Sequence, residues 1–418
     1  MKKHLHTLIW SIFFLKGYIE MFGIMPSIMN LLAIFLIVIL FFESFFNKRM
    51  FFPYLIIYLL LIIVSFVSGP ILNDIGLTEY FFFVRQLFLL FFLYLVVIVN
   101  ERDDDIIKHI LKLFIIYFAI QIPASWIKLI FIGGPEMEDY IGTMSLYQGS
   151  MTTLIAMIGS FFSFSKYLIT KEKKYIIWII LFIIFSQIGG KRAVLFFIPF
   201  GCVLIATYYL YVKGLLNFNL KKILYSLFIF FIFTYLIVRI NPTLNKEHKV
   251  WGSFDLAYTL GFVDYYQNAG TNLMDLKRIN SLTYIFGYYM TSLSAEKILF
   301  GEGAGKLSES KLGVNPITYY YGIRYGARMG IVWIALQIGI IGTFLYLFLM
   351  YKILKFVLNF KDRILHKLIF IGLFITIMVD TLLYSMSSIQ YFTIGGLFFT
   401  YFGFFYRDKY LGKNVLNE

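Results

Sequence analysis

Cysteine and charge are both scarce in this sequence. Its 418 residues include one cysteine, Cys202, which stands inside an apolar run. The chain by itself can therefore form no disulfide framework, no cysteine zinc site and no dithiol redox centre. Charged residues make up only 14% of the chain, whereas 60% of the residues are hydrophobic and 21% are aromatic. That is too apolar for one soluble core, so the composition predicts a polytopic membrane protein.

Other common signatures are also missing. No group of Asp, Glu and His residues has the spacing of metal ligands, and we find no internal repeat and no cleavable signal peptide. The formal net charge is +14, but the lysines and arginines stand mainly between apolar runs, which is typical of membrane topology. We therefore expect no metal, no cofactor and no nucleic-acid partner.

Long apolar runs divide the chain into about twelve predicted membrane spans. A helix that crosses a bilayer needs roughly 17–25 apolar residues, and these runs come close to that length, so we expect an all-α fold. The first run is interrupted by Lys16 and Glu20, and a re-entrant or interfacial piece is its alternative. The spans are predicted near 7–25, 26–46, 51–70, 80–99, 107–132, 149–168, 175–189, 193–212, 222–240, 329–351, 367–386 and 389–406.

The distribution of basic residues orients these spans. The short loops 71–79 and 133–148 contain acids but no base, whereas most alternate loops carry lysines. The positive-inside rule then places both termini in the cytoplasm. The predicted organisation is nine spans over 1–240, an extracytoplasmic loop subdomain over 241–328, and three spans with a cytoplasmic tail over 329–418. The loop is rich in Tyr and apolar stretches, so we expect it to be ordered, with short helices lying on the membrane.

Charged residues inside the spans are candidates for function, because each costs roughly 2.5–3.5 kcal/mol at a helix centre. Arg85 lies inside the fourth span, either as a structural interhelical arginine or as an anion-binding one. Lys128 and Arg239 stand at outer span ends and are expected to snorkel. Asp380 lies near the middle of the eleventh span, where we expect it to pair with Arg85 or another arginine, or to be neutral.

Two arginine motifs on the predicted outer side indicate an anionic partner. In the turn 189–192, Lys191 and Arg192 follow two glycines, and they either bind phosphate oxygens or merely cap a hairpin. Arg324 and Arg328 stand at i and i+4 just before the tenth span, so both guanidinium groups would share one helix face. Neighbouring tyrosines suit a sugar-binding lining or an aromatic belt; among them are Tyr320 and Tyr321.

Candidate proton acceptors also fall in the large loop. Glu302 stands in a glycine-rich turn, where it serves either as a general base or as the partner of a loop lysine. His248 is the only histidine on the predicted outer side, and Asp255 and Asp264 are alternative acids. Arg278 is a further cation of the same loop. The sequence does not choose among these bases.

Three short motifs resemble those of a known family. Residues 190–193, Gly-Lys-Arg-Ala, match a small-Arg-small pattern, residues 300–303 match a Phe-Gly-x-Gly turn, and residues 142–143 match a Gly-Thr turn. With the dozen spans and the late outer loop, the chain resembles the O-antigen and capsule polysaccharide polymerases (Wzy-type), which are relatives of the O-antigen ligases. Gly339 and Gly342 match the glycine pair of the ligases, but Arg328 and Met329 stand where their histidine motif falls. This departure favours a polymerase over a ligase.

The resemblance implies a metal-independent glycosyltransferase in the bacterial plasma (inner) membrane. Its substrate would be an undecaprenyl-pyrophosphate-linked oligosaccharide, joined into longer chains at the outer face in O-antigen or capsule biosynthesis. Membrane lipid surrounds such an enzyme, and a chain-length regulator protein is a further candidate partner. The expected catalytic residues are Arg192, Arg324, Arg328, Glu302 and His248, and the expected substrate-binding residues are Arg85, Lys191, Arg278, Tyr320 and Tyr321. The alternatives are an O-antigen ligase and a lipid-linked oligosaccharide flippase or transporter, although a carrier usually shows repeated halves.

Overall fold

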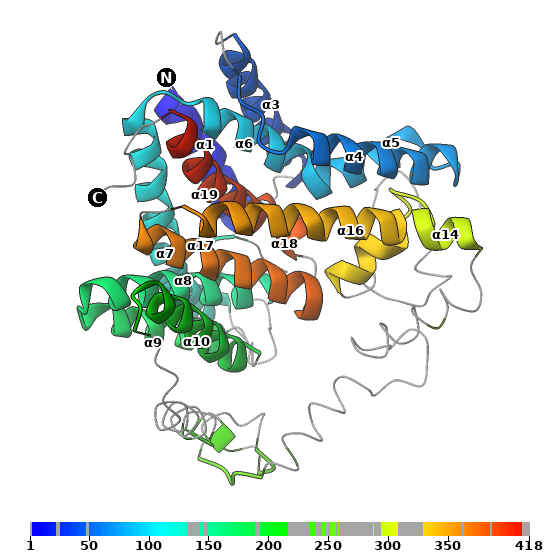
Figure 1. The fold of residues 1–418 in the computed structure, drawn as a ribbon. Coiled ribbons are helices and arrows are strands. Elements are labelled where there is room, and N and C mark those ends of the chain that lie inside the picture. The colour runs from blue at the N-terminus through cyan, green and yellow to red at the C-terminus, as the bar shows by residue number, and fades with distance from the viewer. Residues whose placement is uncertain are drawn as a thin grey trace.

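In the computed structural model, helices are the regular secondary structure of the described residues, and no strand occurs among them (Figure 1). This confirms the predicted all-α class. The described residues are 2–21, 26–46, 50–132, 142–144, 149–188, 193–215, 294–307, 329–360, 363–384 and 387–411, together with residue 287 and short pieces between 232 and 258.

Helices follow the apolar runs of the sequence closely. Leu, Ile and Phe dominate them, and the outward residues of several helices remain exposed, for example Leu31 at 62% on α3 and Ile56 at 74% on α4. An apolar surface of this kind is expected to face lipid. The elements of the N-terminal half are α1 (Lys2–Phe14), α2 (Lys16–Met21), α3 (Pro26–Phe45), α4 (Leu55–Phe66), η1 (Val67–Ile71), α5 (Leu77–Val84), η2 (Arg85–Leu89), α6 (Leu90–Asn100), α7 (Asp104–Ile132), α8 (Gly149–Thr170), α9 (Lys174–Ile188) and α10 (Val194–Val212).

The C-terminal part adds three long helices, α16, α17 and α19, to the bundle. The long helix α16 packs against α4, η1 and α17, and α19 packs along α6. The elements are α14 (Ala295–Phe300), α16 (Gly330–Leu358), α17 (Ile364–Val379), η4 (Asp380–Tyr384), α18 (Ser387–Gln390) and α19 (Phe392–Leu411).

Six of these helices are long and apolar enough to cross a membrane, or seven if the pair Leu77–Leu87 and Leu90–Asn100, bent by 46°, forms one span. Leu55–Ile71 and Lys174–Ser186 are shorter apolar helices. The membrane character predicted from composition is therefore supported. Most of the predicted ninth span, 222–240, lies outside the described residues. The six are Ile28–Phe45, Asp104–Lys128, Met151–Thr170, Val194–Val212, Gly330–Leu358 and Ile364–Tyr384.

The first helix is a core element. In α1, Trp10 and Phe14 are fully buried, and the Trp10 ring packs edge-on against Phe114 of α7 with 4.6 Å between centroids. Its Nε1 donates a hydrogen bond of 2.7 Å to the Tyr94 hydroxyl of α6. A buried indole needs such a partner. The helix α1 therefore packs inside the bundle, and the run is not one continuous helix, because it breaks at Leu15.

A buried turn holds that break in place. Thr143 donates its hydroxyl hydrogen to the Phe14 carbonyl at 2.6 Å and accepts from Nε2 of Gln121 at 2.8 Å. Its backbone N–H donates to Oε1 of the same glutamine at 2.9 Å, and its carbonyl accepts from Gly17 N at 2.9 Å. The Gly-Thr turn noted in the sequence thus joins the α1–α2 break to α7.

Replacing Thr143 with valine should lower the stability of the whole bundle. Valine keeps the shape but leaves the Phe14 carbonyl and an amide hydrogen of Gln121 without this partner, and an unsatisfied buried group costs about 1–3 kcal/mol. Thermal unfolding of the purified protein in detergent should show a lower Tm. Thr207→Val is the matched control, because the exposed Thr207 hydroxyl bonds only to Val203 O of its own helix within the described ranges. Equal Tm values for the two variants would contradict this role.

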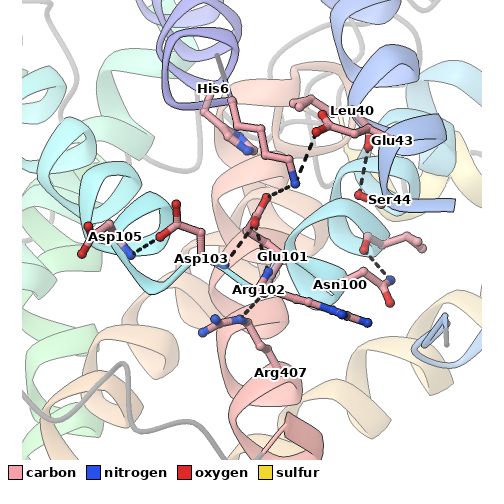
Figure 2. Close-up of polar contacts among 12 residues, drawn as sticks. His6, Leu40, Glu43, Ser44, Asn100, Glu101, Arg102, Asp103, Asp105 and Arg407 are labelled. Carbon is pink, nitrogen blue, oxygen red and sulfur yellow. Dashed lines mark hydrogen bonds and ion pairs between the residues drawn. The ribbon is translucent and has the colours of Figure 1, made fainter. Parts of the chain in front are cut away.

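One end of the bundle carries a polar cluster that joins both ends of the chain (Figure 2). Lys2 of α1 pairs with the buried Glu101 at 3.3 Å. Arg407 of α19 donates from Nε to the Glu101 carbonyl at 2.6 Å and pairs with Asp104 at 2.5 Å. Nearby, Arg363 and Asp408 form a buried ion pair at 2.7 Å. The described ends of the chain therefore lie at the same end of the bundle.

Candidate functional site

Most of the predicted site residues lie outside the described residues, so their positions stay predictions. Arg85 and Glu302 are described, together with the acid Asp255. The predicted site residues and alternative acids that lie outside the described residues are Lys191, Arg192, His248, Asp264, Arg278, Tyr320, Tyr321, Arg324 and Arg328.

The glycine-rich turn after α14 packs into the bundle against α16. Ser294 caps α14 by accepting from Lys297 N at 3.4 Å, and the helix closes with Gly301 N donating to Lys297 O at 2.8 Å. Gly301 has φ 85°, a value that favours glycine. The chain then turns so that Glu302 N donates to Leu336 O of α16 at 2.7 Å.

The long helix α16 is broken where this turn meets it. Gly339 has φ 64° and ψ −168° inside the helix, and a Cβ there would overlap the Leu299 carbonyl and Gly301 N. Beside the break, the Gln337 backbone carbonyl accepts from Ser68 Oγ at 2.6 Å. The Gln337 side chain also contacts the turn, because its Oε1 accepts from Gly305 N at 3.0 Å. The two glycine motifs, at 300–303 and 339–342, therefore meet in space.

The π-helical segment η1 forms the other wall of the site. A π-turn carries one extra residue and frequently marks a functional site. Gly69 of η1 lies so close to the Ala304 carbonyl that a Cβ at 69 would overlap it. Just after η1, Asn73 donates from Nδ2 to Ser68 O at 2.7 Å and to Gly301 O at 3.4 Å. The turn is thus enclosed between η1 and the break in α16.

Glu302 is the charged group at the centre of this arrangement. It is only 4% exposed. Its Oε2 accepts from Lys306 Nζ at 2.8 Å, whereas the buried Oε1 has no hydrogen-bond partner among the described residues. Pairing with a loop lysine, one of the two predicted roles, is therefore present. A buried carboxylate oxygen with no partner is also able to accept a proton from a bound group.

Arg85 lies on the neighbouring helix, at the first position of the π-helical segment η2. It is half-buried and its guanidinium carbon lies 4.9 Å from the Phe82 ring centroid. No carboxylate pairs with it in the described part of the chain. Two residues earlier, Phe83 stacks on Trp333 of α16 with 5.3 Å between centroids. This contact places Arg85 on the part of the bundle that receives the glycine turn.

The third π-helical segment, η4, starts at Asp380, which is fully buried. Its Oδ2 accepts from Ser388 N at 2.6 Å, so the carboxylate caps the start of α18. It forms no ion pair with Arg85, so the first of the expected alternatives is wrong, whereas pairing with another arginine and a neutral carboxyl stay predictions. The break in the helix supplies a backbone N–H group that stabilises the acid at this position.

Two other cations also differ from expectation. Lys128 was predicted to snorkel, yet it is 3% exposed and its Nζ lies 5.7 Å from the Tyr18 ring centroid. Arg239 donates from Nε to Gly252 O and from Nη1 to the Tyr235 hydroxyl, both at 3.0 Å. Both cations therefore contact protein groups, and Arg239 joins the segment at Gly252 to Tyr235 through its two hydrogen bonds.

Sequence reasoning missed Ser68, Asn73 and Gln337, which hold the glycine turn. Each is a polar residue in or beside an apolar run, and that was the available signal. Within the described ranges, no three His, Cys, Asp or Glu side chains are grouped to hold a metal ion. Comparison with protein-family models gave no match, and no curated protein matches the chain.

Proposed function

We propose that this protein is a polysaccharide polymerase that joins undecaprenyl-pyrophosphate-linked repeat units at the outer face of a bacterial plasma membrane. In this proposal the chain has twelve spans, both termini are cytoplasmic, and the loop 241–328 is extracytoplasmic. The glycine turn and the break in α16 then form the outer end of the active site.

The arrangement along α16 supports this orientation. The glycine turn contacts α16 at Gln337 and Gly339. The Lys352 carbonyl accepts a hydrogen bond from Tyr54 at 3.2 Å, and Phe360 packs on Phe405 of α19, near the cluster of both chain ends. At 1.5 Å per residue these contacts lie about 20–30 Å apart along the helix, close to the hydrocarbon thickness of a bilayer. The turn and the chain ends would therefore face opposite sides of the membrane.

The burial of the Glu302 carboxylate is the observation on which the proposal mainly rests. Polymerisation requires an acceptor sugar hydroxyl to attack an anomeric carbon, and that hydroxyl must lose a proton. The Oε1 of Glu302 is buried beside this turn and has no hydrogen-bond partner among the described residues. Such a carboxylate oxygen is suited to accept a proton from a bound hydroxyl without competition from water. The pyrophosphate that leaves gains negative charge, and guanidinium groups stabilise such charge bidentately. We assign that role first to Arg192, Arg324 and Arg328, and in second place to Arg85 and Arg278.

The test is the sugar-chain profile of cells that lack the gene, complemented with wild type or with Arg192→Lys, Arg324→Lys or Arg328→Lys at matched membrane levels. Lysine keeps the charge but loses the planar fork. We expect the null strain to carry only single repeat units on its surface. Wild type should restore long chains, and each lysine variant should restore an amount of long chains at least about a hundredfold smaller.

The profile also separates the alternatives. If the protein were a flippase, the null strain would keep its lipid-linked units inside the cell and carry none at the outer face. If it were a ligase, the null strain would make long chains that stay on the lipid carrier. Either pattern in the null strain would overturn the polymerase proposal.

A further inference from the structure

A groove between α7, α8 and α9 is lined by no residue of the glycine turn and not by Arg85, the described cation of the proposed polymerase site. Its volume is about 110 Å³. Phe118 of α7, Phe162 of α8 and Phe182 of α9 form much of its apolar interior. The neighbouring outward residues Ile115 and Ile177 are 54% and 59% exposed, so the groove opens on a face that lipid is expected to cover.

The cationic and interfacial aromatic groups of the groove gather at one end, whereas the Ser163 hydroxyl of its lining donates to Gly159 O of its own helix at 2.8 Å. Lys166 near the end of α8 and Tyr175 and Trp178 near the start of α9 line it there. The Lys166 Nζ lies 5.7 Å from the Tyr175 ring centroid, and the Lys174 Nζ lies 5.2 Å from the same centroid. Lys174 also pairs with Glu172, whereas no carboxylate pairs with Lys166 in the described part of the chain. This end therefore offers an unneutralised cation.

The position of this end follows from its neighbours. Phe161, five residues before Lys166 on α8, packs against Gly372 of α17, and α17 begins beside Arg363, which belongs to the buried ion pair with Asp408. The mouth of the groove thus lies at the end of the bundle where the chain ends meet. Under the positive-inside rule this is the cytoplasmic side, and the adjoining segment adds Lys171 and Lys173.

The interior has the length of a lipid tail segment. From Lys166 to Gly159, seven residues along α8, the groove extends about 10 Å at 1.5 Å per residue. One leaflet of a bilayer has a hydrocarbon depth of about 15 Å. At the far end the Phe182 ring lies directly against Gly159, leaving no room for a Cβ there, and this contact closes the groove. An apolar slot with a cation and two interfacial aromatics at its mouth matches an amphiphile with an anionic head.

We propose that this groove binds one acyl chain of an anionic phospholipid of the cytoplasmic leaflet, with the lipid phosphate against Lys166. Charge complementarity selects the head group, and the aromatic interior holds the chain. The lipid would join α7 to the α8–α9 hairpin. The inference rests on the orientation of the bundle and not on the polymerase reaction, because binding requires no sugar transfer.

Trp178 provides the readout. The purified full-length protein is reconstituted in phosphatidylcholine vesicles that contain a minor fraction of phosphatidylglycerol, with brominated acyl chains on either lipid in turn. Bromine quenches indole fluorescence on contact, and the Trp178 contribution is the difference between wild type and Trp178→Phe. Trp126→Phe is the matched control, because Trp126 is 43% exposed on α7 and Trp178 is 37% exposed, but only Trp178 lines the groove.

We expect brominated phosphatidylglycerol to quench Trp178 about fivefold more effectively per molecule than brominated phosphatidylcholine, the factor for one lysine near an anionic head group. Lys166→Gln should remove this preference. Lys355→Gln is the matched control, because the Lys355 Nζ lies 5.8 Å from the Tyr351 ring centroid on α16, a similar lysine–tyrosine geometry outside the groove lining. This variant should leave the preference unchanged. Trp126 should show no preference.

A second variant pair tests the acyl chain itself. Ala119→Phe should fill the groove and reduce Trp178 quenching by both lipids, whereas Ile120→Phe, one residue along and outside the lining, should not. Equal quenching by the two brominated lipids, or a preference that survives Lys166→Gln, would overturn the proposal. So would displacement of the quenching lipid by a polyprenyl phosphate at concentrations where phosphatidylglycerol has no effect, because the groove would then belong to the carrier.

Discussion

Glu302→Gln is expected to abolish long polysaccharide while leaving the protein folded in the membrane. Glutamine has nearly the same volume and retains a carbonyl oxygen that can accept from Lys306, but it cannot take a proton from an acceptor hydroxyl. Removal of a general base typically lowers a rate by about 10²–10⁴. The surface sugar profile of complemented cells should therefore collapse to single units, with Tm and membrane level close to wild type.

Glu296→Gln is the matched control for this change. Glu296 stands in the first turn of α14, six residues from Glu302, and it is exposed. Its variant should give the wild-type profile. Glu302→Asp retains a carboxylate and should restore part of the chain length. Long chains from a well-folded Glu302→Gln protein would show that the carboxylate serves only to pair with Lys306.

Gly339→Ala is expected to cause the largest loss of stability among single substitutions at the site. At φ 64° and ψ −168° the backbone occupies a region that is essentially restricted to glycine. A Cβ would also overlap the Leu299 carbonyl, which is backbone and cannot rotate away. We expect about 2–5 kcal/mol of destabilisation from these two effects. Thermal unfolding should show a large drop in Tm, and chain growth should fail because the glycine turn no longer docks.

Gly214→Ala separates backbone strain from the clash. Gly214 also has φ 64°, but no atom lies within 4 Å of a Cβ built there. Its substitution therefore carries strain alone, and the drop in Tm should be much smaller. Equal drops for the two variants would show that the contact between the glycine turn and α16 contributes little.

Composition and long apolar runs predict several of the described helices. The runs near 107–132 and 149–168 correspond to Asp104–Ile132 and Gly149–Thr170, because a segment in lipid must satisfy its own backbone hydrogen bonds. The breaks were not predicted. The run 329–351 gave no sign of the kink at Gly339, since that kink depends on a contact with residues 299–301, which are distant in sequence.

The candidate site was predictable only in part. The sequence pointed to Glu302 through its glycine-rich turn, and the structure adds its burial and its partner Lys306. Gln337 and Ser68 could not be linked to that turn, because local sequence carries no information on which helices are neighbours. The same limit explains Asp380, whose contact with the Ser388 backbone N–H could not be read from the apolar run around it.

The central claim is that this protein lengthens lipid-linked sugar chains by itself. The most direct measurement is incubation of the purified, reconstituted protein with undecaprenyl-pyrophosphate-linked repeat unit, without nucleotide sugars, followed by separation of the products by length. We predict a ladder of multiples of the repeat unit with release of undecaprenyl pyrophosphate, and no ladder from Glu302→Gln. Repeat units that remain single while they move across the vesicle membrane would contradict the claim.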